Sequence, residues 1–152
     1  MREDIKTLIC RNSHCVLATV SGNRPHCSLM SYTADPEGRE IYMITLRNTQ
    51  KFENLLANPR VSVLIDTREE DVESRGGRTK AVTVNGMFLA IADQGEKDAV
   101  CAQLTAAHPR LQKLAGHSDA EPFCVSVESV LLMDGVTDSY FEELRQDLPR
   151  KQ

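Results

Sequence analysis

Three polar residues stand where a predicted strand ends and a predicted helix begins. Thr45, Arg47 and Lys51 lie in the run TLRNTQK, which follows the apolar segment IYMI and precedes residues with helical periodicity. Backbone N–H groups at the start of a helix bind phosphate groups, and nearby hydroxyls and cations strengthen the binding. Thr49 has the residue type favoured at the N-cap of such a helix. The spacing therefore predicts a site for a phosphorylated cofactor.

Other familiar site patterns are absent from the sequence. It contains neither G-x-x-x-x-G-K nor G-x-G-x-x-G, so the common ATP and NAD sites are not predicted. The dipeptides His14–Cys15 and His26–Cys27 suggest a metal. A tight turn at Gly22–Asn23, however, sets Thr19 opposite His26 and leaves His14–Cys15 far along the ladder. We therefore predict no metal site, and no nucleophile–base group has a recognisable spacing.

Composition limits the class of protein. The chain has 152 residues with 41% hydrophobic and 26% charged residues, which predicts one globular domain. A net charge of −4 argues against nucleic acid or an anionic membrane as the main partner. We expect no secretory signal and no membrane span. Five cysteines without a C-x-x-C pair predict reduced thiols and a cytoplasmic location.

Short strands with helices between them are expected around the polar run. Alternating or β-branched apolar segments predict strands, and apolar residues three and four apart predict helices. The expected strands cover residues 15–20, 25–33, 41–45, 61–66, 81–93 and 123–133, and the expected helices cover 5–9, 49–57, 96–108, 111–114 and 140–148.

Two features refine this outline. Residues 67–80 form a charged, glycine-containing segment without apolar periodicity, which predicts a loop. Gly86 lies inside the long strand 81–93, where it predicts a bulge or bend of the kind that lets a sheet curve into a barrel. Together the elements predict a mainly β (α+β) fold, a small antiparallel barrel with flanking helices.

Three segments resemble a known family. LATVSGNRPHCSLMSY, IYMITLRNTQKFENLLANPRVSVLID and VNGMFLAIAD are similar to the FMN-binding split-barrel proteins related to pyridoxamine 5′-phosphate oxidase. The resemblance runs from about Ser13 to Met133, and its most specific part is the spacing of Thr45 and Lys51 followed by N-P-R-V. It implies a six-stranded antiparallel split barrel that pairs as a homodimer, with one FMN at each of two interface clefts.

The resemblance also implies a domain layout and a set of cofactor-binding residues. One FMN-binding domain would span 1–152, with a core at about 13–133 and a polar C-terminal tail at 134–152 that is predicted to be helical. The segment Cys27–Tyr32 would line the flavin. The implied cofactor-binding residues are Cys27, Ser28, Leu29, Met30, Tyr32, Ile44, Thr45, Arg47, Thr49, Gln50, Lys51, Arg78 and Lys80.

Individual residues in this set have different expected roles. Thr45 and Lys51 match the phosphate-binding threonine and lysine of the family. Gln50 stands where the oxidases often have arginine, and we expect Arg47 to supply the missing charge. Lys80, like Arg78, could contribute from the same or the partner chain. Tyr32 is more typical of a packing residue than of a catalyst.

The expected activity is less specific than the expected cofactor. The oxidases hold the vitamin phosphate with a C-terminal segment rich in arginine and histidine, with tryptophan nearby, whereas this chain has no tryptophan and an acidic tail. Pyridoxamine 5′-phosphate oxidation itself is therefore not expected. The leading hypothesis is an FMN-dependent oxidoreductase that passes electrons or hydride from a reduced donor to a small acceptor. The alternatives are a flavin carrier or electron-transfer module, and a haem-binding relative with a histidine ligand.

Overall fold

The computed structural model describes residues 1–68 and 79–144, and its strands form one antiparallel sheet. The strand order is β2-β1-β5-β6-β7-β4-β3, and β8 pairs with the far half of β7. The strands are β1 (His14–Ser21), β2 (Arg24–Ser31), β3 (Thr33–Ala34), β4 (Glu40–Leu46), β5 (Arg60–Asp66), β6 (Lys80–Ala90), β7 (Ala120–Asp134) and β8 (Asp138–Glu143).

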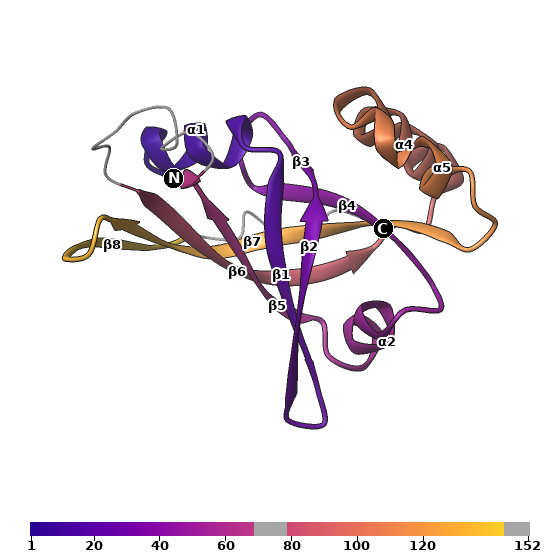
Figure 1. Cartoon of the computed structure of the whole chain (residues 1–152), viewed down its shortest axis with the longest axis horizontal. Coiled ribbons are helices and arrows are strands. Elements are labelled where there is room, and N and C mark those ends of the chain that lie inside the picture. The colour runs from indigo at the N-terminus through magenta and orange to yellow at the C-terminus, as the bar shows by residue number, and fades with distance from the viewer. Residues whose placement is uncertain (69–78, 145–152) are drawn as a thin grey trace.

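The chain itself joins the two edges of this sheet. β2 and β3 stand at opposite ends of the strand order, yet only Tyr32 separates them in sequence. The sheet consequently wraps around a central core as a split barrel (Figure 1). The antiparallel split barrel predicted from the sequence is thus confirmed, whereas the expected strand number was wrong, because the described residues form eight strands and not six.

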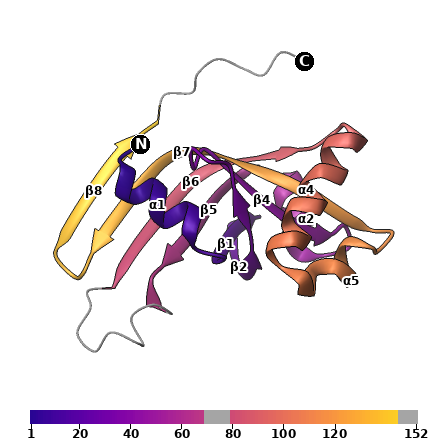
Figure 2. The same cartoon turned by 90° about the horizontal axis from the view of Figure 1, so that it is seen from above.

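Helices cover the barrel at separate places (Figures 1 and 2). The helical segments are α1 (Glu3–Arg11), α2 (Gln50–Ala57), α4 (Gln94–Ala107), the short 3₁₀ turn η1 (Pro109–Leu111) and α5 (Gln112–Ala115). α1 and α2 both contribute to the main core, through residues such as Ile5 and Leu55. α4 packs on β4 in a second cluster around Ile44 and Leu104. No helix among the described residues is long and apolar enough to cross a membrane.

The first hairpin follows directly from its turn residues. Gly22 and Asn23 both have positive φ, 54° and 60°, the backbone geometry of a two-residue turn that suits the twist of the strands. This turn sets Thr19 opposite His26, which confirms the register expected from sequence. His14 lies opposite Ser31 at the far end of the ladder, so the two His–Cys dipeptides do not meet.

Gly86 is the point at which β6 changes register against β7. The pairing shifts between Asn85 and Gly86, which confirms the predicted bulge. A Cβ atom at Gly86 would lie 2.3 Å from the backbone oxygen of Ser126, far inside contact distance. Only glycine lets the two strands approach this closely.

The C-terminal tail differs from the expectation. Residues 138–143 form β8, so the predicted helix at 140–148 is wrong where the structure describes it; residues 145–148 lie outside the described part. β7 continues past Met133 to Asp134, and Gly135, with φ 72°, turns the chain back along it. Phe141 then pairs with Leu131. Backbone pairing with an open strand edge outweighs the weak helical pattern of this segment.

Candidate functional site

Two threonine hydroxyls meet at the junction of β4 and α2. Thr45 is 3% exposed, and its Oγ1 lies 3.2 Å from Oγ1 of Thr49. The Thr49 hydroxyl donates to the backbone oxygen of Leu46 at 2.8 Å and does not cap the helix, although Thr49 occupies the N-cap position. The first N–H groups of α2, at Gln50 and Lys51, therefore have neither an intrahelical acceptor nor a side-chain cap.

Lys51 adds a cation to this junction. It lies in the first turn of α2 and is half-buried. Among residues 1–68 and 79–144, its ammonium group has no ion-pair or hydrogen-bond partner. A partly buried cation without a counter-ion is costly unless a ligand or solvent compensates it. Hydroxyl groups, helix N-terminal N–H groups and a lysine in the first turn are the groups that bind anions, so this junction is a candidate anion site.

The guanidinium group of Arg47 is engaged by acidic residues in the structure. It lies 3.2 Å from the carboxylate of Glu121 and 3.4 Å from that of Asp119, and it donates to the backbone oxygen of Ser118 at 3.0 Å. These contacts tie Arg47 to the segment that begins β7. That Arg47 supplies the second cation of the phosphate site stays a prediction, and its charge is already shared with two carboxylates.

Gln50 also has a role that the sequence did not indicate. Its side-chain amide donates to Oδ1 of Asn54 at 2.9 Å, and Nδ2 of Asn54 donates to Oγ1 of Thr19 at 3.1 Å. Sequence analysis missed Asn54 and Thr19, because an asparagine in a helix and a threonine in a strand are ordinary residues. The alternation of β1 places Thr19 on its buried face, which is the one available signal.

The predicted flavin-lining strand presents its side chains on two faces. Cys27 is exposed and Leu29 is 77% exposed on the outer face of β2, whereas Met30 belongs to the main core. Ser28 is half-buried. A ligand on the outer face would therefore contact the side chains of Cys27 and Leu29, and only the backbone of their neighbours.

Two further residues of the predicted set are structural. Tyr32 is buried, and its hydroxyl donates to the backbone oxygen of Ile9 at 2.6 Å. Burial raises the pKa of this hydroxyl well above its usual range, so it stays protonated. Ile44 is buried against α4 in the second cluster. Neither side chain reaches the surface of the described chain.

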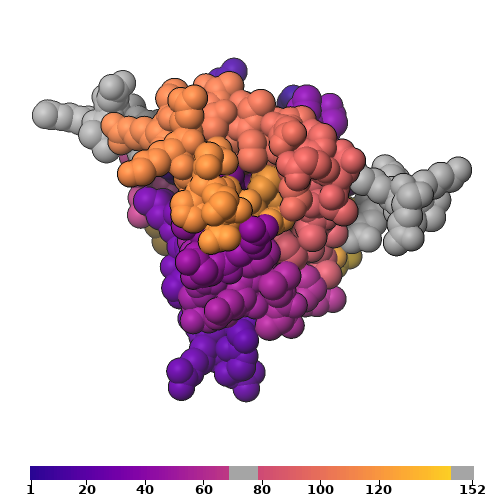
Figure 3. Space-filling model, turned by 90° about the vertical axis from the view of Figure 1, so that its right-hand side faces the viewer, coloured from indigo at the N-terminus to yellow at the C-terminus, as the bar shows by residue number. Residues whose placement is uncertain are grey.

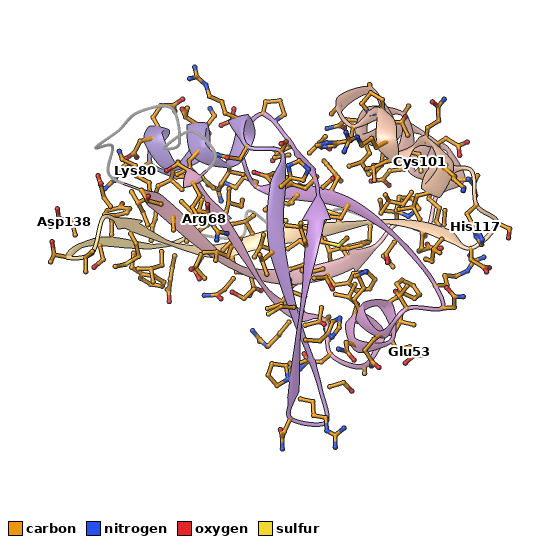
Figure 4. The ribbon with its side chains drawn as sticks, in the orientation of Figure 1. Glu53, Arg68, Lys80, Cys101, His117 and Asp138 are labelled. Atoms are coloured by element: carbon orange, nitrogen blue, oxygen red, sulfur yellow. The ribbon has the colours of Figure 1, made fainter. Side chains whose placement is uncertain are left out.

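Lys80 lies at the other end of the sheet. It is paired with Asp134 on β7, whereas Thr45 lies opposite Glu121, thirteen residues away along the same strand, or roughly 40 Å at the rise of a β-strand. Figure 4 shows Lys80 and the α2 residue Glu53 on opposite sides of the molecule. Lys80 therefore cannot join the Thr45 group within one chain. Arg78 lies outside the described residues.

The structure brings two histidines together that are distant in sequence. The rings of His14 and His108 have centroids 5.7 Å apart. Nε2 of His108 is 2.8 Å from the backbone oxygen of Tyr32, and Nδ1 of His14 is 2.9 Å from Oγ of Ser13. A cavity of about 380 Å³ adjoins His14, with Leu29 and other apolar side chains in its wall. Among the described residues, the second ring nitrogen of each imidazole has no hydrogen-bond partner.

The described chain has no candidate metal cluster, and burial raises the pKa of three of its thiols. Residues 1–68 and 79–144 contain no group of three or more histidine, cysteine, aspartate or glutamate side chains that could hold a metal ion. All five cysteines are free thiols, as expected. Burial raises the pKa of Cys15 to about 12, and burial also raises the pKa of Cys10 and Cys101. These three thiols are thus poor nucleophiles at neutral pH.

The side of the molecule that carries the candidate anion site is shown in Figure 3, where residues 40–60 lie below the segment around residue 115. The small antiparallel split barrel defines the class of protein. The Pyridoxamine 5'-phosphate oxidase family model matches residues 1–134, so the chain belongs to that family. The match includes α1, which precedes the segment from about Ser13 to Met133 that carries the resemblance. A search of curated protein sequences finds no significant match.

Solved structures share the fold at low sequence identity. A haem binding protein from Mycobacterium smegmatis aligns with a TM-score of 0.80 and 20% identity over 93% of this chain and 57% of that protein. This chain thus spans little more than half of that protein's length. A FAD-binding protein from Mesorhizobium loti aligns with a TM-score of 0.71 and 18% identity over 87% of this chain and 93% of that one.

A haem storage protein from Vibrio cholerae, HutZ, is also similar. It aligns with a TM-score of 0.69 and 21% identity over 88% of this chain and 95% of its own. Members of this fold therefore include flavin-binding and haem-binding proteins. At these identities the similarity establishes the fold alone. The ligand of this chain has to be inferred from its own residues.

Proposed function

We propose that the protein is an FMN-binding flavoprotein that acts as an oxidoreductase. The observation that carries the proposal is Lys51, a half-buried lysine in the first turn of α2 that has no partner among the described residues, on the helix whose N-cap residue Thr49 contacts Thr45. This group fits a terminal phosphate monoester, which FMN carries and riboflavin lacks. Membership of the family makes a flavin the first ligand to consider.

Different residues bind the phosphate and the ring of FMN in this proposal. Lys51 and the first N–H groups of α2 hold the phosphate, and Thr45 and Thr49 can rotate their hydroxyls to donate to it. Cys27, Leu29 and the backbone of β2 lie against the ring. Bound FMN would accept hydride or electrons from a reduced donor and deliver them to a small oxidised acceptor. The absence of tryptophan from the sequence makes pyridoxamine 5′-phosphate a poor candidate substrate.

Haem binding is the second candidate, and a specific observation favours it. His14 keeps Nε2 available beside a cavity of about 380 Å³, because its Nδ1 is engaged by Ser13. The cavity wall is mixed, with Leu29 and other apolar side chains beside the charged Asp66 and Arg68. A neutral imidazole whose other nitrogen is hydrogen-bonded is a typical axial iron ligand. Two of the similar structures are described as haem proteins. Iron ligation by His14 would use a different part of the chain from the Lys51 site.

One set of titrations separates these candidates. The ligand-free protein is titrated in parallel with FMN, riboflavin, FAD and hemin, and followed by absorbance and by flavin fluorescence. We expect saturable binding of FMN, with weaker binding of riboflavin and FAD. A sharp Soret band with hemin that is lost in His14→Ala, combined with no flavin binding, would replace the FMN proposal by the haem candidate.

We also propose that two copies of the chain pair through the outer face of the sheet. One register row crosses six strands on this face with mostly apolar side chains. The row consists of Leu29, Val16, Leu64, Thr83, Leu131 and Phe141. Leu29 is 77%, Leu64 37% and Phe141 56% exposed. A contiguous apolar row on a sheet face is typical of an interface, and a two-fold axis lets one face cover itself.

A charge placed in this row should separate the protomers. We expect multi-angle light scattering to give about twice the 17.0 kDa chain mass for the wild type, and the chain mass for Leu64→Glu. Ala106→Glu, an exposed change on α4, is the matched control and should remain dimeric. A wild-type particle of 17.0 kDa at micromolar concentration with FMN bound would contradict the proposal.

A further inference from the structure

The buried threonine and asparagine side chains of the described chain all surround one helix. Residues 1–68 and 79–144 contain three of them, namely Thr19 at 2%, Thr45 at 3% and Asn54 at 2% exposure. Thr45 contacts Thr49 at the N-terminus of α2, and Thr19 contacts Asn54 one turn further along. The other buried side chains are hydrophobic, with the Tyr32 hydroxyl bonded to α1 as the one further hydroxyl. Polar burial is therefore concentrated where α2 meets the barrel.

A chain of hydrogen bonds crosses this contact from strand to helix. Oγ1 of Thr19 on β1 accepts from Nδ2 of Asn54 at 3.1 Å, and Oδ1 of Asn54 accepts from Nε2 of Gln50 at 2.9 Å. Gln50 is the first residue of α2 and precedes Lys51 directly. The chain thus connects β1 to the helical turn that carries the proposed phosphate site.

This arrangement is not what stability alone would favour. Burying an amide and a hydroxyl costs free energy that their hydrogen bonds only partly return, whereas two apolar side chains of similar volume would pack at little cost. Phe52 and Leu55 already anchor α2 in the main core. Apolar packing allows a helix to rotate or slide by small amounts, whereas a hydrogen-bonded pair fixes one orientation.

We propose that Thr19, Asn54 and Gln50 are positioning residues that set the rotation and depth of α2, so that Lys51 faces the Thr45–Thr49 pair. This inference rests on the proposed FMN site and assigns a cause to its geometry. It also accounts for Gln50, which stands where the related oxidases often have an arginine and whose amide orients Asn54 toward Thr19. The site then relies on Lys51 as its own cation.

The same residues relate the phosphate end to the ring end of the site. Thr19 lies directly opposite His26 in the β1–β2 ladder, and His26 precedes Cys27, the first residue of the proposed ring-lining segment. The hydrogen-bond chain therefore fixes α2 to the strand that neighbours the ring-lining strand. A ligand that spans both ends, as FMN does, depends on this spacing, whereas a ligand that uses only the ring end does not.

The test replaces the polar pair by an apolar one. In Thr19→Val/Asn54→Leu no buried polar partner is left unpaired, so we expect the fold and the melting temperature to be retained or raised. Affinity for FMN should fall by about tenfold, the size of one lost charge-assisted contact, while affinity for riboflavin changes less than about twofold. Both are measured by fluorescence titration.

Two single variants serve as controls. Thr19→Ser keeps the hydroxyl and should keep the wild-type ratio of FMN to riboflavin affinity. Leu55→Met alters the packing of the same helix without touching the hydrogen-bond chain, and it should also keep that ratio.

The outcomes that overturn the inference are distinct from those that overturn the FMN site. Suppose that the wild type prefers FMN and that the double variant keeps the same ratio of FMN to riboflavin affinity. Thr19 and Asn54 would then be packing residues without a positioning role. If Leu55→Met lowered the ratio of FMN to riboflavin affinity as much as the double variant, any disturbance of α2 would be enough to weaken FMN binding. Equal binding of FMN and riboflavin by the wild type would remove the phosphate site, and with it this inference.

Discussion

Replacing Lys51 by alanine is expected to weaken FMN binding by about 10- to 100-fold, because a hydrogen bond to a charged group contributes roughly 1.5–3 kcal/mol. Riboflavin, which has no phosphate, should bind almost as tightly as to the wild type. The physical reason is that Lys51 is a half-buried cation without a protein partner in the described chain. Its contribution should also shrink as ionic strength rises.

Lys113→Ala is the matched control for this experiment. Lys113 is an exposed lysine in α5, so its removal changes the net charge by the same amount without touching α2. We expect both ligands to bind Lys113→Ala as they bind the wild type. If Lys51→Ala lost FMN and riboflavin affinity equally, Lys51 would serve the fold of α2 and not the phosphate.

Gly86→Ala should destabilise the protein by about 3 kcal/mol or more, the upper range for inserting atoms into a packed core. The added Cβ would lie 2.3 Å from the backbone oxygen of Ser126 and 3.0 Å from a methyl group of Val125. The first of these contacts is with backbone, so relief requires β6 to move away from β7 and hydrogen bonds at the bulge to break. The midpoint of urea unfolding measures the loss.

Gly116→Ala provides the comparison for the same substitution. Gly116 has right-handed helical geometry, and a Cβ there would meet its nearest atom, the backbone oxygen of Gln112, at an ordinary 3.5 Å. We expect its unfolding midpoint to equal or slightly exceed that of the wild type. A Gly86→Ala midpoint close to that of Gly116→Ala would mean that the bulge does not need glycine.

Much of the fold could be predicted because local chemistry determines it. The Gly22–Asn23 turn fixed the register of the first hairpin, and Asn58 with Pro59 marked the end of α2. The expected strand at 61–66 is β5, whose apolar run is typical of a strand with neighbours on both sides, and β5 lies between β1 and β6. Gly86 indicated the bulge. In each case the residue restricts the local backbone conformation independently of tertiary contacts.

The tail and the helix contacts could not be predicted in the same way. Residues 138–143 form a strand because β7 has an open edge beside them. β4 pairs only with the first half of β7, at residues 120–126, so the second half is free to pair with β8. His14 and His108 meet only through the packing of α4 against the barrel. Such contacts arise from tertiary structure and leave no periodic signal in the sequence.

The candidate site was predictable in part for the same reason. Thr45, Thr49 and Lys51 are close in sequence, and the β4–α2 junction holds the two threonines in contact. The position of Lys80 depends on sheet topology, and that of Arg47 on two acidic residues near the start of β7. Neither could be judged from spacing. The structure separates Lys80 from the Thr45–Thr49 pair within one chain, and it engages the Arg47 guanidinium group with those acidic residues.

The most direct test of the phosphate site is a crystal structure of the protein grown with FMN. We predict phosphate oxygens within hydrogen-bond distance of Lys51 Nζ and of at least one of the hydroxyls of Thr45 and Thr49, with the ring against Cys27 and Leu29. An FMN whose phosphate lies in solvent, or against other cations with Lys51 unengaged, would contradict the proposed phosphate site.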